Sequence, residues 1–209
     1  MSIADKKDNL SKVYYLTIIF FLISFLGWLG ETVCFIAMGY GFSDRGFLSL
    51  PFCTIYGSSI LAIYLIIGTP SKGRLEPLFL RAKKLPSPLK ILSYTGLYAL
   101  YFVIVALIPT VAEFLTALFF DKLFGVVLWD YSLHKYNAFG YVCLGMSLFW
   151  GASITFAMSA IWPLLQKFVG SLSWRPAKII AVALIIAVAI DFVFNLTYLC
   201  VKGKQFLLF

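Results

Sequence analysis

The sequence has 209 residues, of which 62% are hydrophobic and 12% are charged, and its mean hydropathy is +0.95. Soluble domains carry about 25% charged residues, so this composition excludes an ordinary water-soluble globule and indicates a protein whose solvent is the lipid bilayer. The net charge is +8, but the basic residues lie in short segments between apolar runs, which is typical of membrane topology rather than of nucleic-acid binding.

Five apolar stretches are long enough to cross a membrane as helices. A span needs about 20 apolar residues, because roughly 30 Å of hydrocarbon is covered at about 1.5 Å per residue. The pattern therefore predicts an all-α, polytopic membrane helix bundle with five transmembrane helices, at Tyr14–Met38, Phe52–Gly68, Ile91–Phe120, Phe139–Leu165 and Lys178–Cys200. We expect a single transmembrane domain over residues 14–200, preceded by an N-terminal arm at 1–13 and followed by a short tail at 201–209.

The third stretch, Ile91–Phe120, leaves the number of spans open. It is long and contains Pro109, so it is either one kinked helix or a hairpin that turns at the proline and adds a sixth span. The distribution of Lys and Arg does not separate these alternatives. A sixth span would bury Glu113, Asp121 and Lys122 in a short segment, and each central charge costs about 2.5–3.5 kcal/mol, which favours five spans.

The loops between the spans differ in their content of Lys and Arg, and this difference sets the expected orientation. The side that includes the N-terminus carries twelve basic residues and the other side carries five. Because basic loops stay in the cytoplasm, we predict that the N-terminus is inside. The richest segment is the loop at 69–90, whose four prolines argue against a regular helix. It is either a topology anchor near anionic headgroups or a docking surface for a cytoplasmic partner.

Most acidic residues gather on one side of the predicted membrane. Six of the nine fall between mid-membrane and the outer face, at Glu31, Asp44, Glu113, Asp121, Asp130 and Asp191. Ionisable groups at such depths face a protein interior or a water-filled cavity and mark functional paths. The alternative is a structural ion pair, or a protonated, hydrogen-bonded carboxyl that only holds helices together. Glu31 follows Gly27 and Gly30, which permit close helix approach or local unwinding.

Arg45 is the candidate counter-charge for these acids. It lies in the loop at 39–47, where three glycines permit the chain to fold back into the mouth of the bundle. A guanidinium grips a carboxylate or phosphate with two hydrogen bonds, so Arg45 would clamp Glu31 or Glu113, meet an anionic group of a substrate, or stay solvated. The candidate substrate-binding site is an outward-facing acidic pocket that consists of Glu31, Arg45, Glu113, Asp130 and Asp191.

No catalytic residues, cofactor or metal site are predicted. The sequence sets no nucleophile beside a base in an identifiable motif, it has no phosphate-binding glycine loop, and His134 stands without a second metal ligand. The four cysteines have no close pair and fall toward the outer helix ends, where they form a disulfide or serve as small buried hydrophobic residues. They are Cys34, Cys53, Cys143 and Cys200.

Several separated motifs occur together in one order along the chain. They are FLGWLGE at 25–31, DRGFL at 44–48, PFCTIYG at 51–57, Glu113, WDY at 129–131, NAFG at 137–140, CL at 143–144 and FWG at 149–151. In this order they resemble the ABC-transporter type IV (permease-like) family of small bacterial integral membrane proteins, over residues 16–152. The chain departs from the family pattern at Tyr141, where arginine is usual, and at Thr54, where proline is usual.

The resemblance implies transport across a bacterial cytoplasmic membrane, driven by a separate ATPase subunit that docks on the cytoplasmic loops. Five spans are few for a complete path, so a homo-oligomer is also expected. We therefore interpret the chain as a transporter subunit, an ABC-type permease that binds a small polar or cationic solute, rather than as an enzyme. Two alternatives remain open: a membrane-embedded enzyme acting on a lipid or polyprenyl headgroup, and a non-catalytic membrane scaffold.

Overall fold

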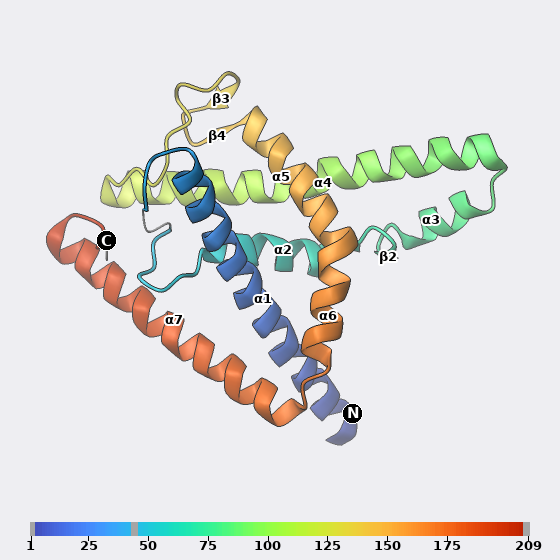
Figure 1. Cartoon of the computed structure of the whole chain (residues 1–209), viewed down its shortest axis with the longest axis horizontal. Helices are drawn as coiled ribbons and strands as arrows, with labels where there is room; N and C mark the ends of the chain where they lie inside the picture. Colours follow the sequence, from blue (N-terminus) through green and yellow to red (C-terminus); the bar gives the residue numbers. More distant parts are fainter. Residues whose placement is uncertain (1–2, 43–45, 207–209) are drawn as a thin grey trace. The chain divides into compact units, whose positions relative to one another are not determined.

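The computed structural model describes residues 3–42 and 46–206. Helices account for 74% of the chain, and within these ranges the strands are limited to two short antiparallel pairs, which confirms the predicted all-α class. The elements shown in Figure 1 are α1 (Ile3–Ala37), α2 (Thr54–Ile66), β1 (Gly68–Thr69), β2 (Lys72–Gly73), α3 (Glu76–Lys83), α4 (Ser87–Phe124), β3 (Asn137–Ala138), β4 (Val142–Cys143), α5 (Leu144–Phe156), the π-helical turn η1 (Ala157–Ile161), α6 (Trp162–Gly170) and α7 (Trp174–Lys202).

Within residues 3–42 and 46–206, four helices are long and apolar enough to cross a membrane, by their length and composition. They are Asn9–Ala37 within α1, the whole of α4, the continuous run Leu144–Gly170 formed by α5, η1 and α6, and α7. Each contains or overlaps one of the predicted spans. The remaining predicted span, Phe52–Gly68, contains only the 13-residue helix α2, which covers about 20 Å at about 1.5 Å per residue. It is therefore shorter than a full membrane crossing.

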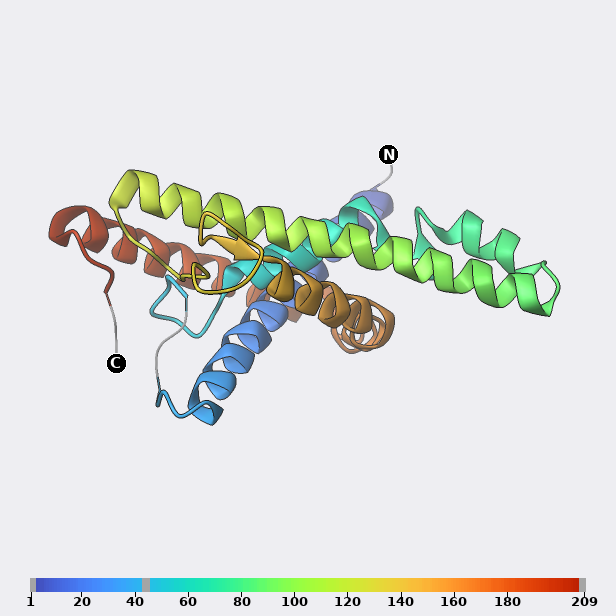
Figure 2. The same cartoon turned by 90° about the horizontal axis from the view of Figure 1, so that it is seen from above.

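Helix α4 continues through Pro109 without a hairpin, so the third apolar stretch forms one helix rather than two (Figure 2). Proline removes one backbone donor from a helix, and nearby hydroxyl groups compensate for such defects in apolar surroundings. Thr110 Oγ1 lies 2.7 Å from the carbonyl oxygen of Ala106 and 2.9 Å from Ser147 Oγ. Both polar contacts are made by the residue that directly follows the proline.

The proline-rich segment 69–90 is more regular than its composition predicts. Strands β1 and β2 form a tight hairpin in which Gly68 pairs with Gly73, and α3 follows immediately. Pro77 stands in the first turn of α3, where a missing N–H group breaks no helical hydrogen bond. No regular helix runs through the whole segment, as the prolines predict, but the short helix α3 was not predicted, because a proline at a helix start favours the helix rather than interrupts it.

The described chain divides into two compact units. The first consists of Met1–Ser58, Phe119–Leu128 and Leu165–Phe209. In this unit α1 packs against α7, and the Tyr15 hydroxyl donates to the carbonyl oxygen of Leu172 at 2.8 Å, just before α7 begins. The start of α2 approaches α1 closely at Gly57, where a Cβ atom would lie 2.6 Å from the carbonyl oxygen of Phe20. Small residues of this kind permit close helix packing in membranes.

The second unit consists of Ser59–Leu118 and Trp129–Leu164. Here α4 and α5 meet at Gly151, where a Cβ atom would lie 2.9 Å from Ala106 Cβ. The buried Tyr101 of α4 donates its hydroxyl to the carbonyl oxygen of Gly68 at 3.0 Å and so ties the β1–β2 hairpin to this helix. The Tyr64 and Trp162 rings lie 4.4 Å apart between centroids and join α2 to α6.

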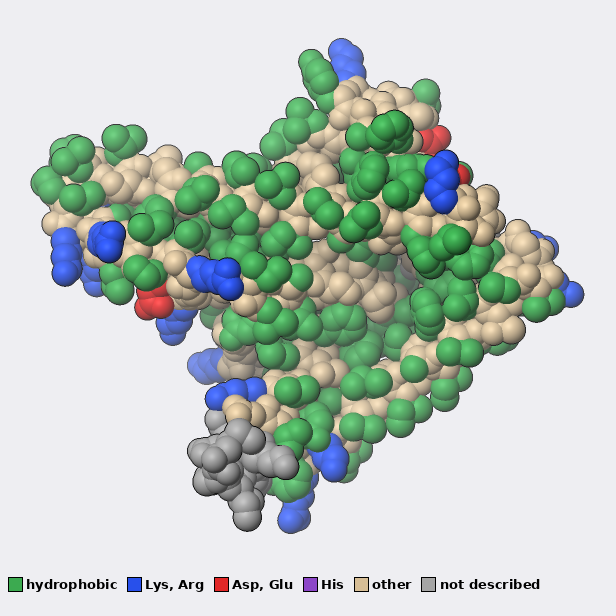
Figure 3. Space-filling model, turned by 180° about the vertical axis from the view of Figure 1, so that it is seen from behind, with side chains coloured by type: hydrophobic (Ala, Val, Ile, Leu, Met, Phe, Trp, Pro, Cys, Tyr) green, Lys and Arg blue, Asp and Glu red, His purple; other side chains and the backbone are tan. Residues whose placement is uncertain are grey.

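The exposed faces of the long helices are apolar. In α7, Ile190 and Val193 are 66% and 61% exposed, and in α4 Leu107 and Leu115 are 57% and 56% exposed. Figure 3 shows hydrophobic side chains spread along the helices over the visible face. Apolar surfaces this extensive mark contact with lipid or with another protein, since soluble monomers rarely expose them.

The close contact between α1 and α2 yields a first prediction. A Cβ atom at Gly27 would lie 2.9 Å from Tyr56 Cβ and nearer still to its ring. We expect Gly27→Ala to lower the free energy of unfolding in detergent by about 1–3 kcal/mol, the usual effect of overpacking. Gly30→Ala is the matched control on the same helix, because a Cβ there meets no other described atom within 4 Å. Equal thermal stability of the two variants would contradict the packing.

Candidate functional site

Glu31 in α1 is bound by a side chain from the start of α2. The Tyr56 hydroxyl donates a hydrogen bond to Glu31 Oε1. Gly27 lies one helical turn before Glu31, and its lack of a side chain leaves room for the Tyr56 ring. In the FLGWLGE motif, the first glycine therefore leaves room for the tyrosine that binds the glutamate of the same motif.

Asp191, in the apolar helix α7, belongs to a polar network that joins this helix to the segment before α2. Its Oδ2 atom accepts the backbone N–H of Leu50 at 3.1 Å, and its Oδ1 atom lies 3.2 Å from Asn195 Nδ2. Asn195 stands one turn further along α7, is fully buried, and donates to Ser49 Oγ at 3.0 Å. A carboxylate and an amide on one face of α7 thus bind two consecutive residues of the same loop.

The segment 46–53, which supplies these partners, is not helical and is held against the first unit at several points. Phe47 packs on Phe120 and Phe192 with ring centroids 4.9 and 5.6 Å apart, and Leu48 is buried. At its far end the Cys53 N–H donates to the carbonyl oxygen of Ser24 at 3.0 Å. Irregular backbone is tolerated among apolar helices only where protein satisfies its polar groups, and this segment meets that condition.

In the second unit the buried acid is Glu113 of α4. The indole N–H of Trp150, on α5, donates to Glu113 Oε1 at 3.0 Å. Glu113 is only 9% exposed, so this contact lies inside the protein. The contact between Thr110 and Ser147 lies about one turn earlier on both helices, which gives the α4–α5 interface a short ladder of polar contacts.

Asp130 lies outside the helices, in the loop that precedes β3. Its Oδ1 atom accepts the backbone N–H of Ser132 at 2.8 Å, and these hydrogen bonds from Ser132 hold the pKa of the Asp130 carboxyl below its usual value. Asn137 fastens the same loop, since its amide donates to the carbonyl oxygens of Ser132 and His134 at 3.1 and 2.8 Å. Asp130 therefore shapes a turn and remains fully accessible to water.

The five predicted site residues fall in different parts of the chain. Glu31 and Asp191 belong to the first unit, where both are bound by residues of the segment 49–56, while Glu113 and Asp130 belong to the second unit. Arg45 lies outside the residues that the structure describes. Asn195 and Trp150, which bind Asp191 and Glu113 through their side chains, were not predicted as site residues. An asparagine four residues after Asp191 in an apolar helix was the available signal for the first.

The described residues hold no group of three or more His, Cys, Asp or Glu side chains that is arranged to bind a metal ion. Cys34, Cys53, Cys143 and Cys200 form no disulfide with one another in the described structure. Cys53 and Cys143 are buried, as expected for small hydrophobic residues, whereas Cys34 and Cys200 are exposed. The acids are therefore the principal polar groups of the apolar helices.

These features define an all-α membrane protein with carboxyl groups hydrogen-bonded inside its apolar helices. The sequence model of the family described as "Putative ABC-transporter type IV" matches residues 18–196, and the chain belongs to this family. The match extends beyond the stretch that carries the resemblance in the sequence and includes most of α7. No curated protein and no solved structure matches the chain significantly.

The network around Asn195 makes a second prediction. We expect Asn195→Ala to lower the free energy of unfolding by about 1–3 kcal/mol, because it leaves polar groups of Ser49 and Asp191 without a buried partner. Thr197→Ala is the control on the same helix, since that exposed hydroxyl bonds only its own helix, at the carbonyl oxygen of Val193. Thermal unfolding in detergent measures both, and a loss no larger than that of the control would contradict the network.

The Asp130 turn predicts a dependence on pH. Its folded pKa is depressed, so the turn is favoured at pH above the unfolded value of about 3.9 and is lost as the pH falls through the folded pKa. We expect the Ser132 amide to lose protection from hydrogen exchange only in that acidic window. Asp130→Asn keeps a side-chain acceptor but removes the titration, so protection that still changes at acidic pH in this variant would contradict the assignment.

Proposed function

We propose that the chain is the membrane-spanning permease subunit of an ABC-type transporter in a bacterial cytoplasmic membrane. It binds a small polar or cationic solute through acidic residues that open toward the outer face. The proposed binding residues are Glu31, Arg45, Glu113, Asp130 and Asp191. Membership of the ABC-transporter type IV family supports the transport role.

The main support for the proposal is the set of hydrogen bonds that the Asp191 carboxylate accepts. Its hydrogen-bond donors, the Leu50 N–H and the Asn195 amide, are neutral, so they orient the carboxylate without cancelling its charge. A carboxylate that is anchored but not neutralised attracts a cation or the cationic group of a solute. The non-helical segment beside it adds backbone carbonyl groups, which are the other ligands that transporters use for cations.

The proposed orientation keeps the N-terminus and residues 69–90 in the cytoplasm. This segment contains α3, whose last turn carries Arg81 and Lys83 while Phe79 and Ala82 are buried. A short basic helix packed on the end of a long membrane helix is a suitable docking surface for a separate ATPase subunit. Association with a second copy of the chain would supply the additional helices that a complete transport path needs.

Transport in membrane vesicles tests this function. Right-side-out and inverted vesicles, from cells with and without the chain, are given a panel of labelled small cations and neutral polar solutes, with ATP or a non-hydrolysable analogue inside or outside. We expect ATP-dependent movement of at least one cation that requires the chain. Asp191→Asn should reduce it by about tenfold or more, as expected when a charged contact worth about 1.5–3 kcal/mol is lost.

Asp121→Asn is the control, because Asp121 lies near the end of α4, pairs with the adjacent Lys122 at 2.9 Å, and is not among the proposed binding residues. Its transport rate should equal that of the wild type at equal protein abundance. Equal movement of every solute in vesicles with and without the chain would overturn the transport function. Equal rates for Asp191→Asn and wild type would remove Asp191 from the binding site.

A further inference from the structure

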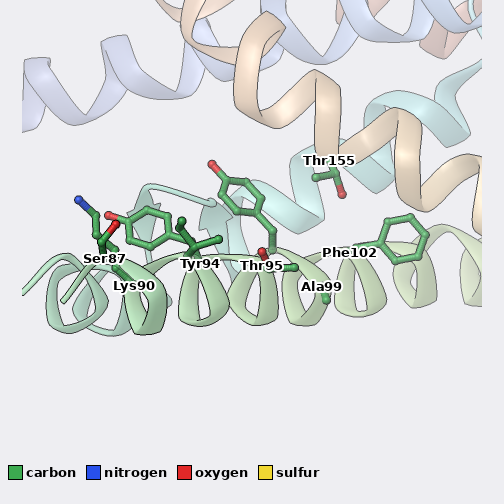
Figure 4. A pocket seen from close by; sticks show the side chains of 9 residues that line it. Ser87, Lys90, Tyr94, Thr95, Ala99, Phe102 and Thr155 are labelled. Atoms are coloured by element: carbon green, nitrogen blue, oxygen red, sulfur yellow. The ribbon is translucent and has the colours of Figure 1, made fainter. Parts of the chain in front are cut away.

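A groove of 860 Å³ runs along α4 in the second unit (Figure 4). Ser87 and Lys90 line one end, Tyr94, Tyr98 and Ala99 line the middle, and Phe102 lines the other end, where Thr155 faces it from α5. Most of the lining is hydrophobic or aromatic, and its charged group stands at one end. The groove therefore has a charged end, and the rest of its length is mostly apolar.

The walls of this groove are fixed by packing. Phe79 of α3 is buried and contacts both tyrosines edge to face, with ring centroids 5.4 Å from Tyr94 and 5.4 Å from Tyr98. At the far end, Gly151 brings α5 against Phe102, whose ring would lie 3.0 Å from a Cβ atom at that glycine. Edge-to-face aromatic contacts and a close helix crossing hold the groove open in a defined shape.

Positive charge concentrates at the Lys90 end. Arg81, Lys83 and Lys84 come from the last turn of α3 and its C-cap, just before α4 begins at Ser87. Within the described chain no carboxylate pairs with Lys90, which is half-buried. The N-terminus of α4 lies at the same end and adds the positive pole of a long helix. An anionic group is favoured there and nowhere else along the groove.

We infer that this groove binds one anionic phospholipid. Its phosphate contacts Lys90 and Ser87, and one acyl chain lies along Tyr94, Ala99 and Phe102. Lys90 and Phe102 are separated by about 18 Å along the helix at about 1.5 Å per residue, close to the roughly 15 Å depth of one hydrocarbon leaflet. A small polar solute would leave the apolar length empty, and a peptide would not match a charge confined to one end.

Photo-crosslinking of lipids tests this site on the full-length protein in nanodiscs. Phosphatidylglycerol and phosphatidylcholine, each with a diazirine on one acyl chain, are compared at equal concentration, and the labelled residues are mapped by mass spectrometry. We expect phosphatidylglycerol to label residues 91–102 about fivefold more than phosphatidylcholine, the preference that one basic residue near the surface supplies. Lys90→Gln should lower this preference while leaving the labelling by phosphatidylcholine unchanged, and Arg81, Lys83 and Lys84 account for the preference that remains.

Ala99→Trp fills the groove and should reduce labelling to the level found elsewhere on the protein. Leu100→Trp is its matched control, because the adjacent Leu100 is 44% exposed and does not line the groove. Labelling that is the same for both headgroups in the wild type would overturn the proposal, as would equal labelling of the two tryptophan variants. The comparison of headgroups needs no variant, so poor folding of Ala99→Trp leaves the test intact.

Discussion

A carboxyl group on an apolar helix must find hydrogen-bond donors in protein, because lipid supplies none, and this constraint organises the structure. Glu31 of α1 takes the Tyr56 hydroxyl, Glu113 of α4 takes the Trp150 indole, and Asp191 of α7 takes the Leu50 N–H. Each of these donors lies on a different segment from its acid. The acids therefore connect elements that hydrophobic contacts alone would leave free to slide in a solvent as apolar as they are.

The segment 49–56 shows how this constraint joins two apolar helices through one short stretch of chain. It is tied to α1 through Tyr56 and to α7 through Ser49 and Leu50, and the ring of Phe52 packs against Phe21 and Phe25 of α1. Hydrogen bonds between membrane helices are worth only about 0.6–1.7 kcal/mol each, so these polar contacts hold the segment together with the packing of its rings rather than alone.

The long helices were predicted well because each needs a long run of apolar residues, and such a run is visible in the sequence alone. The continuity of α4 through Pro109 follows from the high cost of burying Glu113 and Asp121 in a separate short span. Helix α3 was missed because Pro77 was treated as a breaker, whereas its place in the first turn decides its effect. The acids were found because they stand out in apolar runs. The Leu50 N–H could not be found, since a backbone donor leaves no mark in the sequence.

A double-mutant cycle between Glu31 and Tyr56 tests most directly whether hydrogen-bonded acids hold the helices together. Glu31→Leu removes the acceptor, Tyr56→Phe removes only the hydroxyl, and unfolding of all four proteins is measured in the same detergent. We expect a coupling free energy of about 0.6–1.7 kcal/mol between the two side chains, and Tyr56→Phe should be nearly neutral once Glu31 is gone. Strictly additive effects would show that the hydroxyl does not hold the acid, and would contradict the account.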